Sequence, residues 1–161
     1  MQRIMIKNCP IEWAKLIDPE RKFEAAGVWQ ADIVLDEEAA KQVTATGGKY
    51  RTKDGRKLLR VKKNVKRRDG TMNNPPRVVD ANRVQLSDDA VRALGNGSVC
   101  NYSLSPYEWT FSGNRGVTFY LDAVQVVDYK EFKPTNNDPF EVIAEATIKG
   151  EEPVISSDME F

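Results

Sequence analysis

The chain has 161 residues, 40% of them hydrophobic, which is enough for one domain with a hydrophobic core. It has 24 Lys and Arg, 24 Asp and Glu, and no His, a composition that excludes His-based nucleophiles, His acid–base catalysis and most zinc sites. No apolar segment approaches the length of a membrane span, the first residues do not resemble a signal peptide, and there is no CxxC, so we expect a cytosolic protein without disulfides, membrane contact or cofactor.

Two strands and a helix are predicted ahead of residue 49. Residues 1–8 and 27–36 read as strands, and the second alternates apolar with polar side chains. Its apolar positions, which we expect in the core, are Trp29, Ala31, Ile33 and Leu35. Asp36 is a predicted helix N-cap because two acidic residues follow it, and Gly47 is the predicted end of that helix.

Residues 49–68, here called the basic segment, contain eleven Lys or Arg and one acidic residue, Asp54. A strand over residues 57–66 would place most apolar side chains on one face and most polar ones on the other. The apolar face comprises Leu59, Val61, Val65 and, among them, Lys63. The polar face comprises Arg60, Lys62, Asn64 and Lys66. Same-face neighbours lie roughly 6.6 Å apart, which suits an extended phosphate backbone, and we expect the flanking sequences to be mobile loops.

Charge is divided unevenly along the chain. Residues 1–79 carry 18 Lys and Arg against 10 Asp and Glu, a net charge of +8, whereas residues 80–161 carry 6 against 14, a net charge of −8. Solvated surfaces usually mix charges of both signs, so the high density of positive charge in the basic segment favours a polyanionic ligand. The cations that we predict to contact it are Lys49, Arg51, Lys53, Arg56, Lys57, Arg60, Lys62, Lys63, Lys66, Arg67, Arg68, Arg77 and Arg115.

The second half is predicted to form a short helix and a long hairpin. Ser87 is the expected N-cap of the helix, and residues 98–129 read as the hairpin. The alternation of the return strand shifts phase near Asp122, which indicates a bulge. A further short helix is expected near Asp138. Strands outnumber helices and no βαβ rhythm is visible, so a curled, mostly antiparallel barrel fits best.

Aromatic side chains provide candidate stacking surfaces. Tyr107, Trp109 and Phe111 share one face if the pleat continues past Pro106, and each could stack a base for roughly 1–3 kcal/mol. The alternative is that Pro106 marks a bulge that returns these rings to the core. Tyr50, within the basic segment, is expected to be exposed and is a further stacking candidate.

The last eleven residues, 151–161, are acidic, lack Lys and Arg, and end in an aromatic residue. We expect them to form a disordered tail that follows a domain of residues 1–150. A flexible acidic strip could lie along the basic segment as a mimic of DNA. DNA would displace it, and the freed strip could then insert into a partner protein. The expected tail contacts are Glu151, Glu152, Asp158, Glu160 and Phe161. The alternative is a tail that only aids solubility.

Three segments resemble the bacteriophage single-stranded DNA-binding proteins of the OB-fold, acidic-tail type. They are GVWQADIVLDEEAAKQV (27–43), GNGSVCNYSLSPYEWTFSGNRGVTFYLDAVQVVDY (95–129) and DMEF (158–161). The second is the most specific, through its Gly-Asn-Gly-Ser turn, its Tyr-x-Trp-x-Phe strand and its LDAVQVVD strand. Residues 49–77 resemble the family only as a variable basic insertion, so no individual DNA contacts carry over.

This resemblance implies a mainly β, OB-fold-like five-stranded barrel with short helices and loop insertions. It implies non-enzymatic, sequence-nonspecific binding of single-stranded DNA during phage replication, recombination or repair, in the cytoplasm of the infected bacterial host. It also implies a tail that docks on replication proteins such as DNA polymerase or helicase. Weaker binding of double-stranded DNA, strand annealing and a homodimer stay open.

Two other functions compete with this prediction. A magnesium-dependent nuclease or resolvase needs two or three carboxylates around a metal, but no spacing of acidic residues here matches a metal motif. An RNA-binding module would prefer RNA over DNA of the same sequence through contacts with the 2′-OH.

Overall fold

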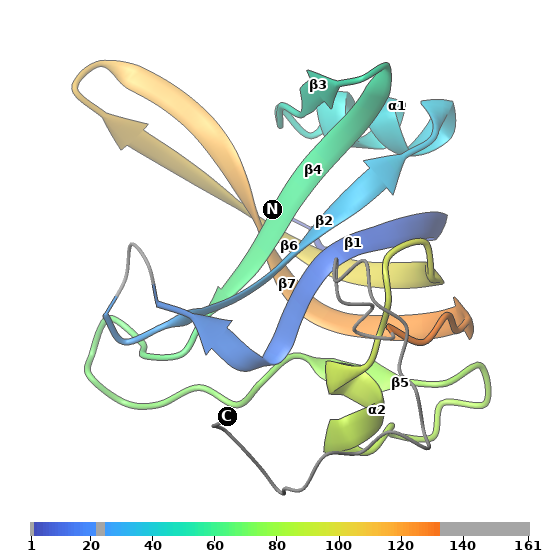
Figure 1. The fold of residues 1–161 in the computed structure, drawn as a ribbon. Coiled ribbons are helices and arrows are strands. Elements are labelled where there is room, and N and C mark those ends of the chain that lie inside the picture. Colours follow the sequence, from blue (N-terminus) through green and yellow to red (C-terminus); the bar gives the residue numbers. More distant parts are fainter. Residues whose placement is uncertain (1, 22–24, 133–161) are drawn as a thin grey trace, which may run out of the picture.

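The computed structural model describes residues 2–21 and 25–132, and Figure 1 shows its ribbon. Its elements, in chain order, are β1 (Ile4–Glu20), β2 (Val28–Leu35), α1 (Glu37–Ala45), β3 (Arg51–Lys53), β4 (Arg56–Asn64), β5 (Arg77–Val79), α2 (Asp88–Arg92), β6 (Val99–Phe111) and β7 (Asn114–Asp128). Neither helix in these two ranges is long and apolar enough to cross a membrane. The helix expected near Asp138 and the acidic tail lie outside the described residues.

Five strands of the described part of the chain close into a barrel. β1 pairs antiparallel with both β2 and β6, β2 pairs antiparallel with β4, and β6 pairs antiparallel with β7. A parallel bridge between Lys62 of β4 and Tyr120 of β7 completes the ring. The short strands β3 and β5 extend the sheet beside β4 and β7. The predicted mainly β, OB-fold-like barrel is therefore confirmed.

Apolar side chains that alternate along the strands fill the barrel. The four predicted core positions of β2 are buried, and the indole Nε1 of Trp29 donates a hydrogen bond to the Ile17 carbonyl at 3.0 Å. The hydroxyl of Tyr102 donates to the Cys9 carbonyl at 2.8 Å, which satisfies a polar group in the core. Cys9 and Cys100 are free and buried. Burial raises the pKa of both thiols, that of Cys100 to about 12.

Both short helices begin where the sequence predicts. The Asp36 carboxylate accepts a hydrogen bond from the backbone N–H of Ala39 at 2.8 Å, and the Ser87 hydroxyl accepts one from Ala90 at 3.2 Å. Because N-caps satisfy backbone donors that the first helical turn leaves free, these contacts fix the start of α1 and α2. α1 packs its buried residues Ala39, Ala40 and Val43 into the core.

Strand β1 is longer than predicted. It continues to Glu20 instead of ending near residue 8, and its pairing with β2 shifts register between Glu12 and Lys15 and again before Glu20. Bulges of this kind bend a strand and interrupt the alternation from which a strand is recognised in a sequence.

The expected mobile loop ahead of the basic strand is instead a hairpin. β3 pairs with β4, and the chain turns at Asp54 and Gly55, whose φ angles are 52° and 77°. Two consecutive residues with positive φ are typical of a tight hairpin turn, for which Asp-Gly is a favoured pair. The hairpin of β6 and β7 and the bulge near Asp122 are as predicted, because Ser103 pairs with Ala123 whereas Leu104 pairs with Leu121.

Candidate functional site

Strands β2 and β4 present a polar outer surface. Gln30 pairs with Lys62 and Asp32 pairs with Arg60, whereas the residues that alternate with them point into the core. Arg60 and Lys62 therefore lie on the outside of the barrel, on the face that the alternation of the basic segment predicts for them. The predicted inward residues Leu59, Val61 and Val65 are buried.

Asp32 is a buried carboxylate, only 1% exposed, between two arginines of the basic segment. Its Oδ1 accepts a hydrogen bond from Arg60 Nε at 2.6 Å, and its Oδ2 accepts one from Arg51 Nη2 at 2.8 Å. Arg60 Nη2 also donates to Oδ2 at 3.2 Å, so this pair is bidentate. The hydrogen bonds to Asp32 raise the pKa of Arg60. Both guanidinium side chains remain about half exposed, at 54% and 48%, and can donate outward to a second anion.

A second carboxylate holds a third arginine. Glu12 of β1 lies opposite Asp32 of β2, and its carboxylate pairs with the guanidinium of Arg56. The basic segment is thus less one-sided in space than in sequence, because acids from β1 and β2 approach it. Sequence reasoning did not identify Glu12 or Asp32 as parts of the site. The signal for Asp32 was its outward position in the alternation of residues 27–36.

The β6–β7 hairpin projects from the barrel (Figure 1). Its strand β6 carries a row of aromatic side chains. Tyr107, Trp109 and Phe111 are all exposed, Phe111 by 73%. The alternative that these rings return to the core is therefore wrong, and the register shift lies between Ser103 and Leu104 instead of at Pro106.

Two contacts orient the aromatic rings. Tyr107 meets Tyr120 edge to face, with ring centroids 5.8 Å apart. Trp109 pairs with Gly116 across the hairpin, and a Cβ added to this glycine would lie 2.3 Å from Cζ2 of the indole. The indole therefore lies against the backbone of Gly116, in space that any larger residue would occupy.

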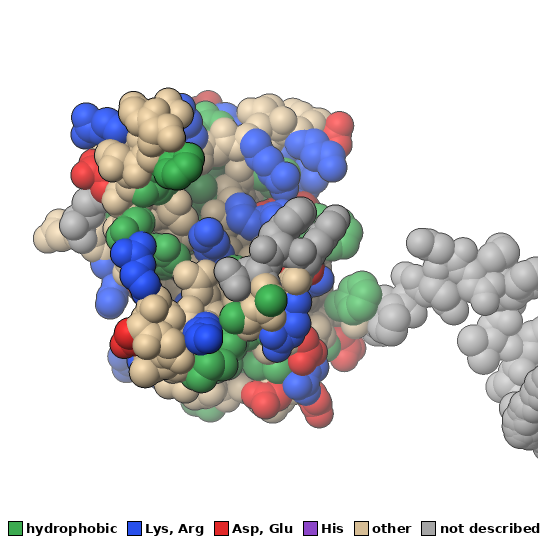
Figure 2. Space-filling model, turned by 90° about the vertical axis from the view of Figure 1, so that its left-hand side faces the viewer, with side chains coloured by type: hydrophobic (Ala, Val, Ile, Leu, Met, Phe, Trp, Pro, Cys, Tyr) green, Lys and Arg blue, Asp and Glu red, His purple; other side chains and the backbone are tan. Residues whose placement is uncertain are grey.

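The bridge between Lys62 and Tyr120 joins the cationic strand to the aromatic hairpin. Bridged residues project to the same side of a sheet, so the outer row of β4 continues into the outer row of β7 and β6. We name this surface the outer face; its residues are Gln30, Asp32, Arg51, Arg60, Lys62, Tyr107, Trp109, Phe111 and Tyr120. Figure 2 views the molecule from the side toward which the hairpin projects and shows Lys and Arg side chains around hydrophobic ones.

Three further predicted cations lie at the end of β4. Lys66, Arg67 and Arg68 line a pocket of about 300 Å³ together with Ala26, Gly27 and Asn64. Arg67 is held in place, since its Nε donates to the Asn73 side chain at 2.7 Å. This pocket offers a second group of positive charges next to the outer face.

Other predicted residues lie elsewhere. Lys57 and Tyr50 line a pocket beside α1, and Tyr50 is partly buried against the core, so the expectation of an exposed ring is wrong. Lys63 pairs with Trp29 and lies on the inward row. Arg77 lines a pocket beside α2. Arg115 pairs with Thr110 and so lies on the opposite face of the hairpin from the aromatic row, whereas Lys49 and Lys53 are exposed.

Acidic residues do not gather into a metal site in the described part of the chain. No group of three or more His, Cys, Asp or Glu side chains there is placed to hold a metal ion. Asp32 of the outer face and Glu12 beside it on β1 instead have arginine partners.

Comparison with known proteins shows the fold of this chain. No family model matches, and no match was found among curated proteins. Among solved structures, a C-terminally truncated single-stranded DNA-binding protein of bacteriophage Enc34 is 9% identical, with a TM-score of 0.61, and the match covers 81% of this chain and 88% of that one. The single-stranded DNA-binding protein gp2.5 of bacteriophage T7 is 16% identical, with a TM-score of 0.60, over 88% of this chain and 99% of that one. The Enc34 protein in complex with single-stranded DNA matches with a TM-score of 0.58 at 10% identity, over 83% and 89% of the two chains.

Proposed function

We propose that this chain binds single-stranded DNA without sequence preference and without catalysing a reaction. The observation that carries this proposal is the outer face, where a cationic strand and a row of exposed aromatic rings meet at Lys62 and Tyr120. Proteins that bind single strands combine these two features, cations for the backbone and rings for the bases. The likeness in fold to phage single-stranded DNA-binding proteins, one of them in complex with single-stranded DNA, supports the proposal.

In the proposed complex, phosphates lie along β4 and bases stack on the hairpin. Arg51, Arg60 and Lys62 donate hydrogen bonds to phosphate oxygens, and Asp32 keeps the two guanidinium groups in place. Tyr107, Trp109 and Phe111 each offer a ring to a base. Stacking is worth roughly 1–3 kcal/mol per base and tolerates any sequence, because every base has a π-face.

We further propose that the acidic tail competes with DNA and recruits partner proteins. Residues 151–161 hold four acidic side chains, no Lys or Arg, and Phe161 at the end. Such a strip is complementary in charge to the outer face and to a basic, apolar pocket on another protein. A tether to the domain can give it a local concentration in the millimolar range. The fitting context is replication, recombination or repair of phage DNA in the host cytoplasm, with a polymerase or helicase as partner.

Fluorescence anisotropy with labelled oligo-dT tests DNA binding and the tail separately. Lys62→Ala and Trp109→Ala are expected to weaken binding, whereas Arg92→Ala is the matched control. Like Lys62, Arg92 is a solvent-accessible cation, but it belongs to α2 and pairs with Asp18 and not with a residue of the outer face. A chain ending at Gly150 is expected to bind more tightly than the full chain if the tail competes. Absence of binding by the full chain and the truncated chain at low salt would falsify the single-strand proposal.

A further inference from the structure

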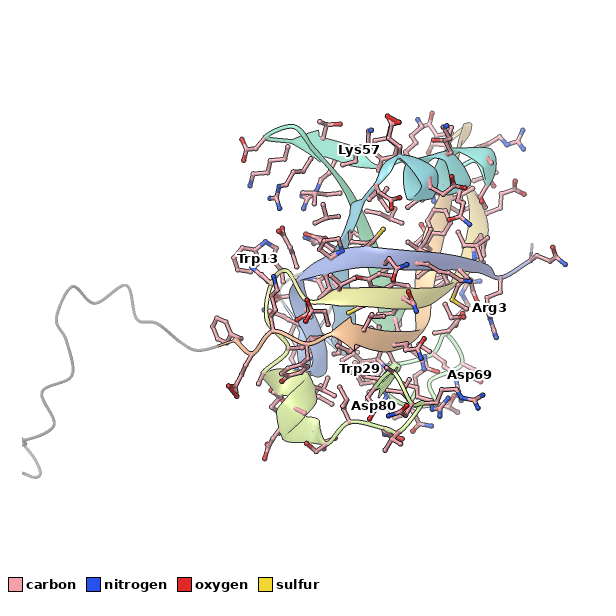
Figure 3. All side chains as sticks on the ribbon, turned by 90° about the vertical axis from the view of Figure 1, so that its right-hand side faces the viewer. Arg3, Trp13, Trp29, Lys57, Asp69 and Asp80 are labelled. Carbon is pink, nitrogen blue, oxygen red and sulfur yellow. The ribbon has the colours of Figure 1, made fainter. Side chains whose placement is uncertain are left out.

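Trp13 is an exposed aromatic residue in the middle of β1, with 65% of its surface open to solvent. Its φ angle is 52°, in the left-handed region that a bulky side chain rarely adopts. Figure 3 shows it at the periphery of the molecule, on the opposite side from Arg3. A large apolar ring that is both exposed and held in an unfavourable backbone conformation calls for a functional explanation.

The neighbouring loop holds Trp13 in this conformation. The backbone N–H of Trp13 donates a hydrogen bond to the side-chain Oδ1 of Asn96 at 2.8 Å. The next residue of that loop, Gly97, donates its N–H to the Ile11 carbonyl at 2.9 Å. Two hydrogen bonds from one loop, at Ile11 and at Trp13, thus hold the backbone where the bulge between Glu12 and Lys15 begins.

Trp13 lies on β1, next in the chain to a residue that contacts the basic segment. Its neighbour Glu12 pairs with Asp32 in the sheet and forms an ion pair with Arg56. The backbone of Trp13 therefore lies next to the ion-paired arginines. From the hairpin, the outer face runs over β7, β4 and β2 to β1, and adjacent strands lie about 4.8 Å apart. Along this path, the cations of β4 therefore lie between the hairpin that carries the aromatic row and the strand that carries Trp13.

We propose that Trp13 is a second base-stacking platform, which binds a nucleotide of the single strand after the strand has passed the cations of β4. This inference rests on the proposed function and extends the DNA path across β1. A path with aromatic surfaces at both ends fixes both ends of the bound segment. Trp13 then contributes only when the oligonucleotide is long enough to reach it.

The test compares Trp13→Ala with the unchanged full-length chain on oligo-dT of about 4 and about 16 nucleotides, the two ends of the range of site sizes known for OB-folds. The variant is expected to lose about tenfold in affinity for the longer oligonucleotide and little for the shorter one. The slope of affinity against salt stays unchanged, because a stacking contact neutralises no phosphate. Trp13→Phe is expected to keep most of the affinity.

The control is Val84→Ala, which removes part of another exposed apolar side chain, 60% accessible, in the turn that follows Asp80. Equal binding of both lengths by Trp13→Ala and the unchanged chain would overturn the role of Trp13 and leave the DNA-binding function standing. An equal loss on both lengths would also overturn it, since the ring would then lie within the shorter path. If the unchanged chain binds neither oligonucleotide, the proposed function fails and the inference fails with it.

Discussion

At the scale of single residues, the least expected feature is a buried carboxylate inside a surface that reads as basic. Asp32 lies on the outer row of β2 and is buried between Arg51 and Arg60, both of which it orients. Burying a charge is costly unless it is paired and hydrogen-bonded, and the bidentate contact with Arg60 satisfies this condition. Asp32 thus fixes two cations of the surface, and its own burial is tolerated only because both arginines pair with it.

Replacing Asp32 tests this dependence. Asp32→Asn keeps the shape of the side chain but leaves two neighbouring guanidinium groups without a counter-charge, so we expect the free energy of unfolding to fall by about 1–3 kcal/mol. Urea denaturation measures the change. Asp18→Asn, which breaks a solvent-exposed pair with Arg92, is the matched control and is expected to have little effect. Equal effects of the two substitutions would contradict the structural role given to Asp32.

The buried thiols give stability a dependence on alkaline pH. Burial raises the pKa of Cys100 from 9.0 to about 12, so the folded state keeps the proton that the unfolded state releases. This contribution to stability is fully present below pH 9.0 and is lost as the pH rises toward 12. One pH unit within that window corresponds to about 1.4 kcal/mol per group. Burial raises the pKa of Tyr102 as well, from an ordinary value of 10.0, and adds to the loss at higher pH.

Urea midpoints across the alkaline range measure this loss. Cys100→Ala removes one of the groups, so its stability is expected to fall less steeply with pH than that of the unchanged chain, whatever its stability at neutral pH. Parallel curves for the two proteins would show that Cys100 does not titrate differently in the folded and unfolded states.

At the scale of elements, the β6–β7 hairpin acts as an arm that carries rings beyond the barrel. Its alternation places Tyr107, Trp109 and Phe111 on one side, and Gly116 leaves room for the central ring. The sequence predicts the hairpin and its bulge, because turn residues and alternation are local signals. It does not predict whether the rings face solvent, because that depends on how far the hairpin extends past the barrel.

Gly116→Ala is a local test of this arm. The added methyl group must displace the Trp109 indole, since it would lie 2.3 Å from Cζ2, but the displaced atoms belong to an exposed side chain. We expect a small change in stability, a shift in tryptophan emission and several-fold weaker binding of oligo-dT. Gly113→Ala is not a suitable control because its φ of 81° adds backbone strain; Thr118→Ala, on the same side of the hairpin, is preferable. Unchanged binding by Gly116→Ala would mean that the position of Trp109 is unimportant for DNA.

The basic segment shows what a linear reading of charge omits. Alternation predicts correctly that Arg60 and Lys62 face outward and that Leu59 and Val61 face inward. It cannot reveal Glu12, which reaches Arg56 from β1 and is 44 residues away in sequence. It also misses the second half of β1, where bulges break the pattern, and this is the stretch that carries Trp13.

At the scale of the whole molecule, the neutral net charge conceals a separation between a basic domain surface and an acidic C-terminal region. If the outer face and the pocket at Lys66 neutralise about five phosphates, the logarithm of affinity should fall with the logarithm of salt concentration at a slope of about −3.5. Between about 50 and about 200 mM salt, this slope gives a loss of about a hundredfold. Anisotropy titrations across salt measure it, and a flat response would contradict phosphate contacts as the source of affinity.

The ring of strands meets, within the described residues, at the parallel bridge between Lys62 and Tyr120, whereas β2 and β4 share a long antiparallel ladder. Amide protons along this seam are therefore expected to exchange with solvent through local opening more readily than those between β2 and β4. Lys62 and Tyr120 also join the cationic and aromatic parts of the outer face. A bound DNA strand would therefore span the seam and stabilise its closed form. Ligand binding and closure of the barrel would then be coupled equilibria. The rate of amide exchange along the seam would fall as the fraction of protein with bound DNA rises.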